Sequence, residues 1–132
     1  MFLSAALSVV AIQTFAPIPV TVENLVGTWQ LSYAEGVDLT DTVATSTLKP
    51  DLTSVSEVIK NGHINRITGK YRIDKGVITH VIDNPMSKSE QGPRAAKVVL
   101  TTRSIVITVP VDVRMGGRNV VVRISSKNDR RN

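Results

Sequence analysis

Apolar and polar residues alternate with a period of two along most of the chain after residue 16. Because successive side chains of a strand point to opposite faces, this alternation is typical of half-buried β-strands. It is clearest over residues 66–73, where apolar side chains and Gly69 alternate with arginine, lysine and threonine. No segment carries a sustained apolar stripe of helical period, so the pattern predicts an all-β domain.

Turn-forming residues divide the alternating pattern into segments. The clearest are Lys49-Pro50-Asp51, Asn61-Gly62, Asp74-Lys75-Gly76 and Gly116-Gly117, which favour tight turns. The longest break is a polar loop over Asn84 to Ala96. The predicted strands are 27–35, 42–48, 53–60, 66–73, 77–83, 97–102, 104–109, 111–115 and 119–126. Because Pro110 either divides two strands or interrupts one, the strand count is eight or nine.

Short connections between these strands favour an antiparallel meander. Pairing the first strand with the last would close the sheet and remove its exposed edges. We therefore predict an antiparallel up-and-down barrel of about eight strands. A two-sheet β-sandwich is the alternative that the same pattern permits.

The start of the first strand resembles a known family. Leu25, Gly27, Trp29 and Leu31 match the L-x-G-x-W-x-L opening of small bacterial lipocalin-like domains, which belong to the calycin/lipocalin superfamily. Lys49-Pro50-Asp51-Leu52-Thr53 is similar to their K-x-D-G-T turn, with leucine in place of glycine, and Gly69-Lys70-Tyr71 is similar to their G-x-[YW] strand. The T-D-Y turn and the amphipathic C-terminal helix of full-length lipocalins are absent from the sequence, so the shorter relatives are the better match.

The resemblance implies structural roles for three residues. In the family, the tryptophan of strand one packs against an arginine of the last strand and closes one end of the barrel, while Gly27 leaves room beside Trp29. Arg123 is the arginine that we assign to this contact, with Arg118 as the alternative. The alternation along the strand opposes Arg123. The valines and the isoleucine near it form the more apolar face, and Arg123 lies on the opposite one.

The N-terminal segment predicts export. Residues Phe2 to Ala16 are uncharged and mostly apolar, and they are too few for a typical membrane-spanning helix of about 20 residues. They resemble a signal-peptide core with cleavage after Ala11 or Ala16, although no lysine or arginine precedes them. We therefore expect a leader over 1–16, a barrel domain over 17–132, and a periplasmic or extracellular location. The alternative is an apolar strand or helix that stays attached.

The composition limits the number of domains and the classes of binding partner. The 132 residues suit one domain, and 42% hydrophobic with 20% charged residues indicates a globular fold. The net charge of +5 is scattered, which indicates a solvated basic surface. Aromatic residues make up only 4%, too few for the stacking platforms of single-strand binders, so we expect no nucleic-acid partner.

Signals for catalysis are weak. The sequence has no cysteine, no G-x-S-x-G elbow and no phosphate-binding glycine loop. Its two histidines, His63 and His80, lack the close spacing of metal ligands. His80 shares one strand face with Ile78 and Ile82, and the rival apolar face is formed by Val77, Thr79 and Val81. We interpret it as a structural histidine, and we expect no enzyme, no metal and no cofactor.

A barrel of eight strands is just wide enough to be filled by side chains or to hold one small molecule. The alternation places an aliphatic set with two tyrosines inside: Trp29, Leu31, Tyr33, Val55, Ile59, Ile67, Tyr71, Ile73, Ile105, Ile107 and Val109. Such an interior suits an apolar or amphipathic ligand, and a dry packed core is the alternative. The predicted ligand-binding residues are Tyr33, Glu57, Tyr71, Ile73 and Ile107.

Two assignments remain open at this level. Alternation places Glu57 on the inner face with Val55 and Ile59, where it could bind a polar head group, but an irregularity near Lys60 would put it outside, which we favour. The loop from Asn84 to Ala96 suggests a different function, a protein-interaction module such as an inhibitor of a secreted enzyme.

Overall fold

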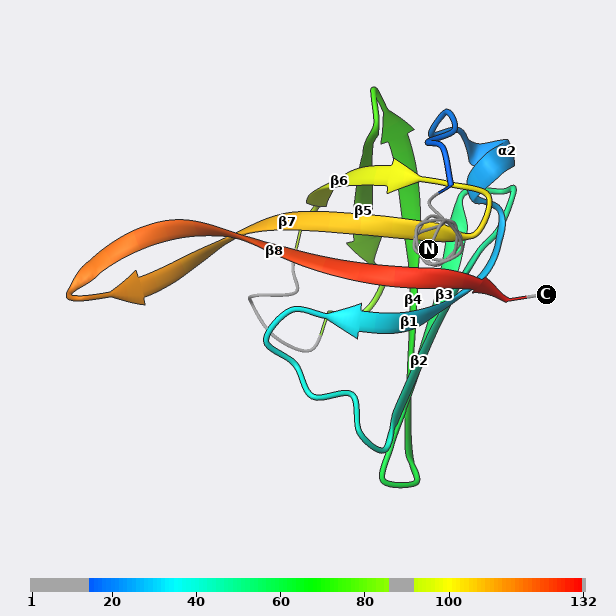
Figure 1. Cartoon of the computed structure of the whole chain (residues 1–132). Helices are drawn as coiled ribbons and strands as arrows, with labels where there is room; N and C mark the ends of the chain where they lie inside the picture. Colours follow the sequence, from blue (N-terminus) through cyan, green and yellow to red (C-terminus); the bar gives the residue numbers. More distant parts are fainter. Residues whose placement is uncertain (1–14, 86–91, 132) are drawn as a thin grey trace, which may run out of the picture.

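Eight antiparallel strands close into a barrel in the computed structural model, which describes residues 15–85 and 92–131. Each strand pairs with its neighbours in the chain, and the last strand returns to the first (Figure 1). The up-and-down barrel is therefore confirmed, and the sandwich is not formed. The strands are β1 Gly27–Ala34, β2 Thr42–Leu48, β3 Thr53–Lys60, β4 His63–Asp74, β5 Val77–Ile82, β6 Arg94–Leu100, β7 Ser104–Met115 and β8 Arg118–Arg131.

The strand boundaries differ from the sequence prediction most at four strands. β4 begins at His63 instead of residue 66, and β8 runs to Arg131 instead of ending at residue 126. β6 begins at Arg94, so three residues of the predicted polar loop belong to a strand. β7 runs through Pro110, which makes one strand where two were also considered. The proline is tolerated because the pairing of β6 with β7 ends at Thr108, so no ladder hydrogen bond to β6 is lost at residue 110.

The tight turn between β3 and β4 forms at the predicted dipeptide. Asn61 and Gly62 both have positive φ, at 50° and 82°. These angles match the hairpin turn whose twist suits the flanking strands. The turn fixes the β3–β4 register, in which Ser54 lies opposite Gly69 and Ser56 opposite Ile67.

This register decides which face of β3 points inward. Directly opposite residues of paired strands share a face, and the inward face of β4 carries Gly69 and the buried Tyr71. Ser54 and Ser56 therefore face the interior. The prediction that Val55 and Ile59 face inward is wrong, because alternation separates the two faces of a strand without saying which is inside.

The core lies at one end of the barrel. It consists of seven buried apolar side chains: Leu25, Trp29, Leu48, Tyr71, Val98, Leu100 and Ile105. The segment before β1 covers this end. Ile18 forms a β-bridge with Leu100, and the short helix α2, Val22–Leu25, contributes the fully buried Leu25. Thr21 caps that helix by accepting a hydrogen bond from the Asn24 amide at 3.2 Å.

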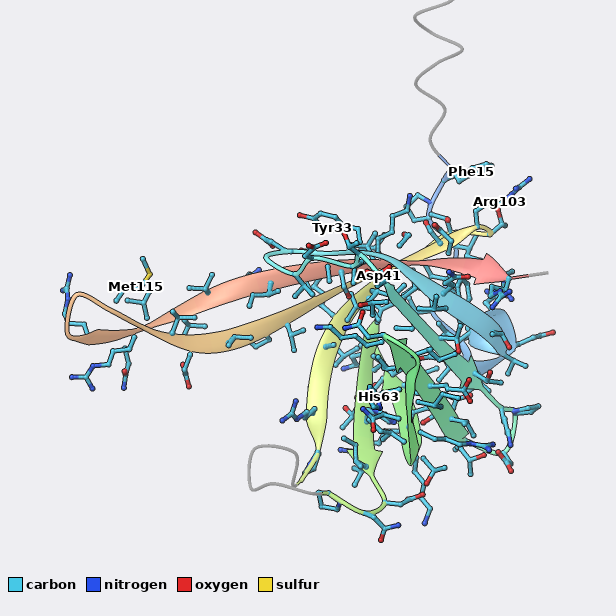
Figure 2. All side chains as sticks on the ribbon, turned by 90° about the horizontal axis from the view of Figure 1, so that it is seen from below. Phe15, Tyr33, Asp41, His63, Arg103 and Met115 are labelled. Atoms are coloured by element: carbon cyan, nitrogen blue, oxygen red, sulfur yellow. The ribbon has the colours of Figure 1, made fainter. Side chains whose placement is uncertain are left out.

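The β7–β8 hairpin extends far beyond the barrel (Figure 1). β6 pairs with β7 only up to Thr108, and β1 pairs with β8 only from Ser126 onward. Residues 109–124, which we call the ribbon, are therefore paired only within the hairpin. The ribbon is rich in valine, with Val121 exposed to 64%, and Met115 lies near its tip (Figure 2).

The predicted leader lies almost wholly outside the described residues, which begin at Phe15. The export prediction is therefore untested by the structure. No helix within residues 15–85 and 92–131 has the length and hydrophobicity required to cross a membrane.

Excision of the ribbon tests whether the barrel folds without it. Replacing residues 110–123 by an Asn-Gly turn joins Val109 to Ile124, which are already cross-strand partners. Because two-stranded ribbons are marginal in water by themselves, we expect the shortened protein to keep a cooperative thermal unfolding transition, measured by circular dichroism. Loss of that transition would show that the ribbon stabilises the barrel.

Candidate functional site

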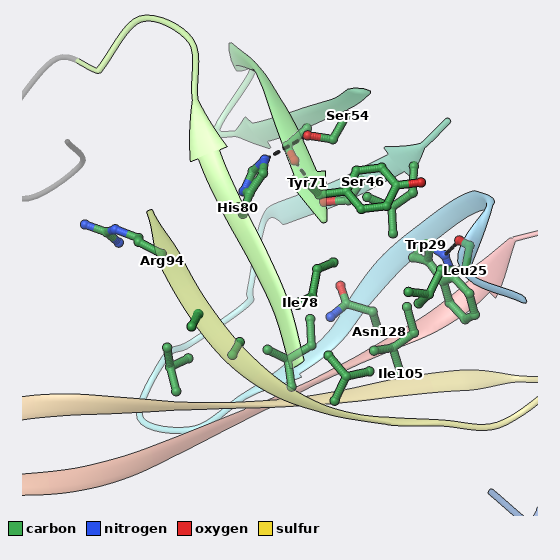
Figure 3. Close-up of a pocket in the computed structure, with 17 residues that line it drawn as sticks. Leu25, Trp29, Ser46, Ser54, Tyr71, Ile78, His80, Arg94, Ile105 and Asn128 are labelled. Carbon is green, nitrogen blue, oxygen red and sulfur yellow. Dashed lines mark hydrogen bonds between the residues drawn. The ribbon is translucent and has the colours of Figure 1, made fainter. Parts of the chain in front are cut away.

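A cavity of about 290 Å³ lies inside the barrel. Its lining includes side chains from every strand and from α2, and Figure 3 shows the 17 residues involved. The interior is therefore packed at one end and hollow beyond it. The cavity has two chemically different sides, an apolar end and a polar wall.

The apolar end is built around Trp29, which is 1% exposed. Its indole N–H donates a hydrogen bond to the Leu25 carbonyl at 2.9 Å, which satisfies the only polar atom of the ring. Leu48, Val98 and Ile105 complete this side of the lining. This end is predominantly aliphatic and aromatic, and its polar side chains are Ser46, opposite Trp29 in the sheet, and Asn128, opposite Ile105.

Arg130 holds Trp29 in place from outside the cavity. Its guanidinium carbon lies 4.1 Å from the centroid of the Trp29 ring, within the range of a cation–π contact. The same guanidinium donates hydrogen bonds to the carbonyls of Asn24 at 2.7 Å and Val26 at 3.1 Å. Arg130 therefore joins the last strand to the first strand and to the segment before it.

Gly27 makes this contact sterically feasible. Its φ is +138°, which disfavours other residues, and a Cβ atom there would lie 2.9 Å from the Arg130 Nη1 atom. The glycine of the opening motif thus leaves space for the arginine.

The assignment of this role to Arg123 is wrong, and so is the alternative Arg118. Arg123 is exposed in the ribbon, opposite Pro110, and Arg118 lies at the ribbon tip opposite Met115. The arginine that reaches Trp29 is Arg130, which lies directly opposite it in the β1–β8 register. The resemblance implied a contact between the tryptophan and an arginine of the last strand, and such a contact is present. Because the ribbon occupies the first part of β8, the arginine that makes the contact lies further along the chain.

The polar wall is centred on His80, which faces the interior as Ile78 does. Its Nε2 atom lies 2.8 Å from the Ser54 hydroxyl, two strands away. Gly69 on the intervening strand permits this reach, because a Cβ atom there would lie only 2.6 Å from His80 Nε2. Ser46 and Ser56 extend the wall, and their hydroxyls are hydrogen-bonded at 2.9 Å.

Burial favours the neutral form of His80. Burial lowers its pKa below the usual 6.5, and this effect outweighs the opposite influence of Asp83. The serine–histidine distance would suit a nucleophile and base. Within the described residues, the contact with Ser54 is the one side-chain hydrogen bond of His80.

Two of the predicted ligand-binding residues line the cavity. Tyr71 and Ile107 both contribute to its lining. The Tyr71 hydroxyl donates a hydrogen bond to the Lys49 carbonyl at 2.6 Å, and burial raises the pKa of the phenol. Tyr71 therefore offers a ligand its ring, while its hydroxyl is already bonded to the backbone.

The other three predicted residues do not line the cavity. Tyr33 is 53% exposed, because a bulge between Leu31 and Tyr33 shifts the alternation and places Tyr33 opposite Lys127. Glu57 lies on the outer face of β3, opposite Arg66, because the inner face belongs to the serines. Ile73 is half-buried and packs against the core. The predicted inward position of Tyr33 is wrong, whereas the outward position of Glu57 is the one we favoured.

Sequence reasoning missed the serines and Arg94 as lining residues. Ser54 and Ser56 alternate within β3 and lie opposite Gly69 and Ile67 in the register, so the period of two carries a signal for them. No sequence signal identified Arg94, which the pattern assigned to a loop. Only its pairing with His80 at the start of β6 places it beside the cavity.

The chain matches no protein-family model, and no curated protein is similar to it in sequence. The closed barrel of eight antiparallel strands is compatible with a lipocalin-like fold.

Substitution of Arg130 tests the contact with Trp29. We expect Arg130→Ala to lower the free energy of unfolding by about 2 kcal/mol, because it removes a cation–π contact and two charge-assisted hydrogen bonds. Arg123→Ala, which removes an exposed arginine of the same strand, should change it by less than about 0.5 kcal/mol. Urea unfolding followed by the fluorescence of the single tryptophan measures both. Equal effects of the two variants would contradict the assignment.

Proposed function

We propose that this protein is an exported lipocalin-like barrel that binds a small amphipathic molecule in its interior. The observation that carries the proposal is the cavity with an apolar end at Trp29 and a polar wall at His80 and Ser54. A ligand would bury its apolar part against the first and orient its polar part on the second.

The size of the cavity limits the ligand. Ligand pockets in proteins commonly measure about 300–1,000 Å³, and this cavity of about 290 Å³ is at the lower end of that range. A compact molecule with one or two rings, or a short branched chain, fits better than a long-chain lipid.

The lipocalin-like part of the proposal is supported by the first and last strands. The strand-one tryptophan follows Gly27 and is covered by an arginine of the last strand, as the resemblance implies for this family. The eight-stranded meander agrees with the same family.

Export is supported by the apolar, uncharged segment from Phe2 to Ala16. Native mass spectrometry of protein purified from the host's cell envelope tests export and binding together. We expect a mass that corresponds to cleavage after Ala11 or Ala16, together with a retained small molecule. Recovery of the full-length chain from the cytoplasm would contradict export.

A variant that fills the cavity tests where the ligand binds. Ala96 lines the cavity from β6, so Ala96→Phe places a ring inside it. We expect this change to weaken binding of phenylnaphthylamine, a neutral fluorescent probe, by about tenfold or more, because the probe and the new ring would compete for one space.

Val99→Phe is the matched control, since Val99 is on the same strand, outside the cavity lining and 46% exposed. It should bind the probe as the unmodified protein does. Ser56→Leu fills the cavity from the opposite wall and serves if Ala96→Phe does not fold. Undiminished binding by a folded cavity-filling variant would refute binding in the barrel.

The ribbon favours a second candidate function, a protein-interaction module. Both of its long edges have unpaired backbone groups within the described residues, so an extended segment of another protein could add to it as a strand. The ribbon carries three arginines and one aspartate, which suits an acidic segment.

Excision of residues 110–123 separates the two candidates. We expect an acidic partner captured stoichiometrically from envelope extract to be lost from the shortened protein and retained by Ala96→Phe. Capture that survives excision of the ribbon would exclude this surface.

A further inference from the structure

The charged chemistry of the cavity lining is of one sign. Its polar lining residues are three serines, Tyr71, Asn128, His80 and Arg94, and no aspartate or glutamate lines it among the residues that the structure describes. Among the described lining residues, the permanently charged side chain is therefore that of Arg94, which is positive, and burial favours the neutral form of His80. Asp83, the carboxylate that influences His80, is outside the lining.

The sheet register positions Arg94 next to the polar wall. Arg94 is the first residue of β6 and lies directly opposite His80 of β5. Side chains of such pairs leave the sheet on the same face, with Cβ atoms about 5 Å apart. Since His80 faces the cavity, Arg94 is directed to the same side, and it is exposed to solvent there.

The two sides of the cavity are spatially separated. Figure 3 shows Arg94 and His80 toward one side of the cavity, with Trp29 and Leu25 toward the other. A molecule lying between them would have His80 and Arg94 at one end and the indole at the other. The exposed Arg94 guanidinium points away from the other lining side chains and would turn toward such a molecule to contact it. The guanidinium fork matches the two oxygens of a carboxylate, or two of the three oxygens of a sulfonate.

We propose that the ligand of this cavity is an amphipathic anion, with its acidic head group on Arg94 beside His80 and its apolar body directed toward Trp29. The inference rests on the proposed ligand-binding function and names the chemical class of the ligand. Partial exposure of Arg94 lets its charge stay hydrated when the cavity is empty, so the unliganded protein contains no buried unpaired cation.

A pair of matched probes tests the charge. Anilinonaphthalene sulfonate and phenylnaphthylamine share one apolar body, and only the first is anionic. We expect Arg94→Gln to weaken binding of the sulfonate about tenfold, as loss of one charge-assisted contact at a partly hydrated site would. Binding of the neutral probe should change less than about twofold, and Arg94→Lys should restore part of the sulfonate affinity.

Lys97→Gln is the control for net charge, because Lys97 is on the same strand but exposed and outside the cavity lining. It should leave both affinities unchanged. Ala96→Phe should weaken both probes, which separates binding in the cavity from binding to the exposed ribbon.

The outcomes distinguish this inference from the function on which it rests. If the unmodified protein binds neither probe, the proposed function fails. If it binds both, but Arg94→Gln affects them equally or affects neither, the cavity binds apolar molecules and the anionic head-group site is refuted. Equal losses in Lys97→Gln and Arg94→Gln would also refute it, because general surface charge would then explain the effect.

Discussion

The contact between Trp29 and Arg130 is the interaction on which the architecture depends. It joins the first strand to the last at the point where the sheet closes, and it does so at a buried indole whose N–H is already satisfied by Leu25. The guanidinium also binds two carbonyls of the segment before β1. Closure and coverage of the barrel end are thus parts of one arrangement, which requires glycine at position 27 because a larger residue would meet the arginine.

Sealing one end leaves the other part of the interior available for a site. The large side chains gather around Trp29, while smaller serines occupy the inner face of β3 and Gly69 occupies that of β4. Small residues leave volume unfilled, and the missing side chain of Gly69 lets His80 reach Ser54 across a strand. The cavity and its polar wall therefore have the same origin, namely small residues on the inner face of two neighbouring strands.

In the ribbon, β7 and β8 are longer than closure of the barrel requires. Closure uses β7 up to Thr108 and β8 from Ser126, yet both strands continue together well beyond these residues. The extra length carries valines on a hairpin with two open edges, which is a costly surface for a monomer to expose. The same extra length places Arg123 within the ribbon and Arg130 opposite Trp29.

The sequence by itself determined the all-β class, most strand positions, the Asn61-Gly62 turn and the tryptophan that begins the barrel, because these follow from local alternation and turn chemistry. Tertiary structure decided which face of β3 is inside and the outward position of Tyr33 after a bulge. It also decided the contact of Arg130 with Trp29 and the pairing of Arg94 with His80 across β5 and β6. The physical reason is that alternation relates neighbours within one strand, whereas a binding site is made by the register between strands. That register is set by pairing between segments that lie apart in the chain.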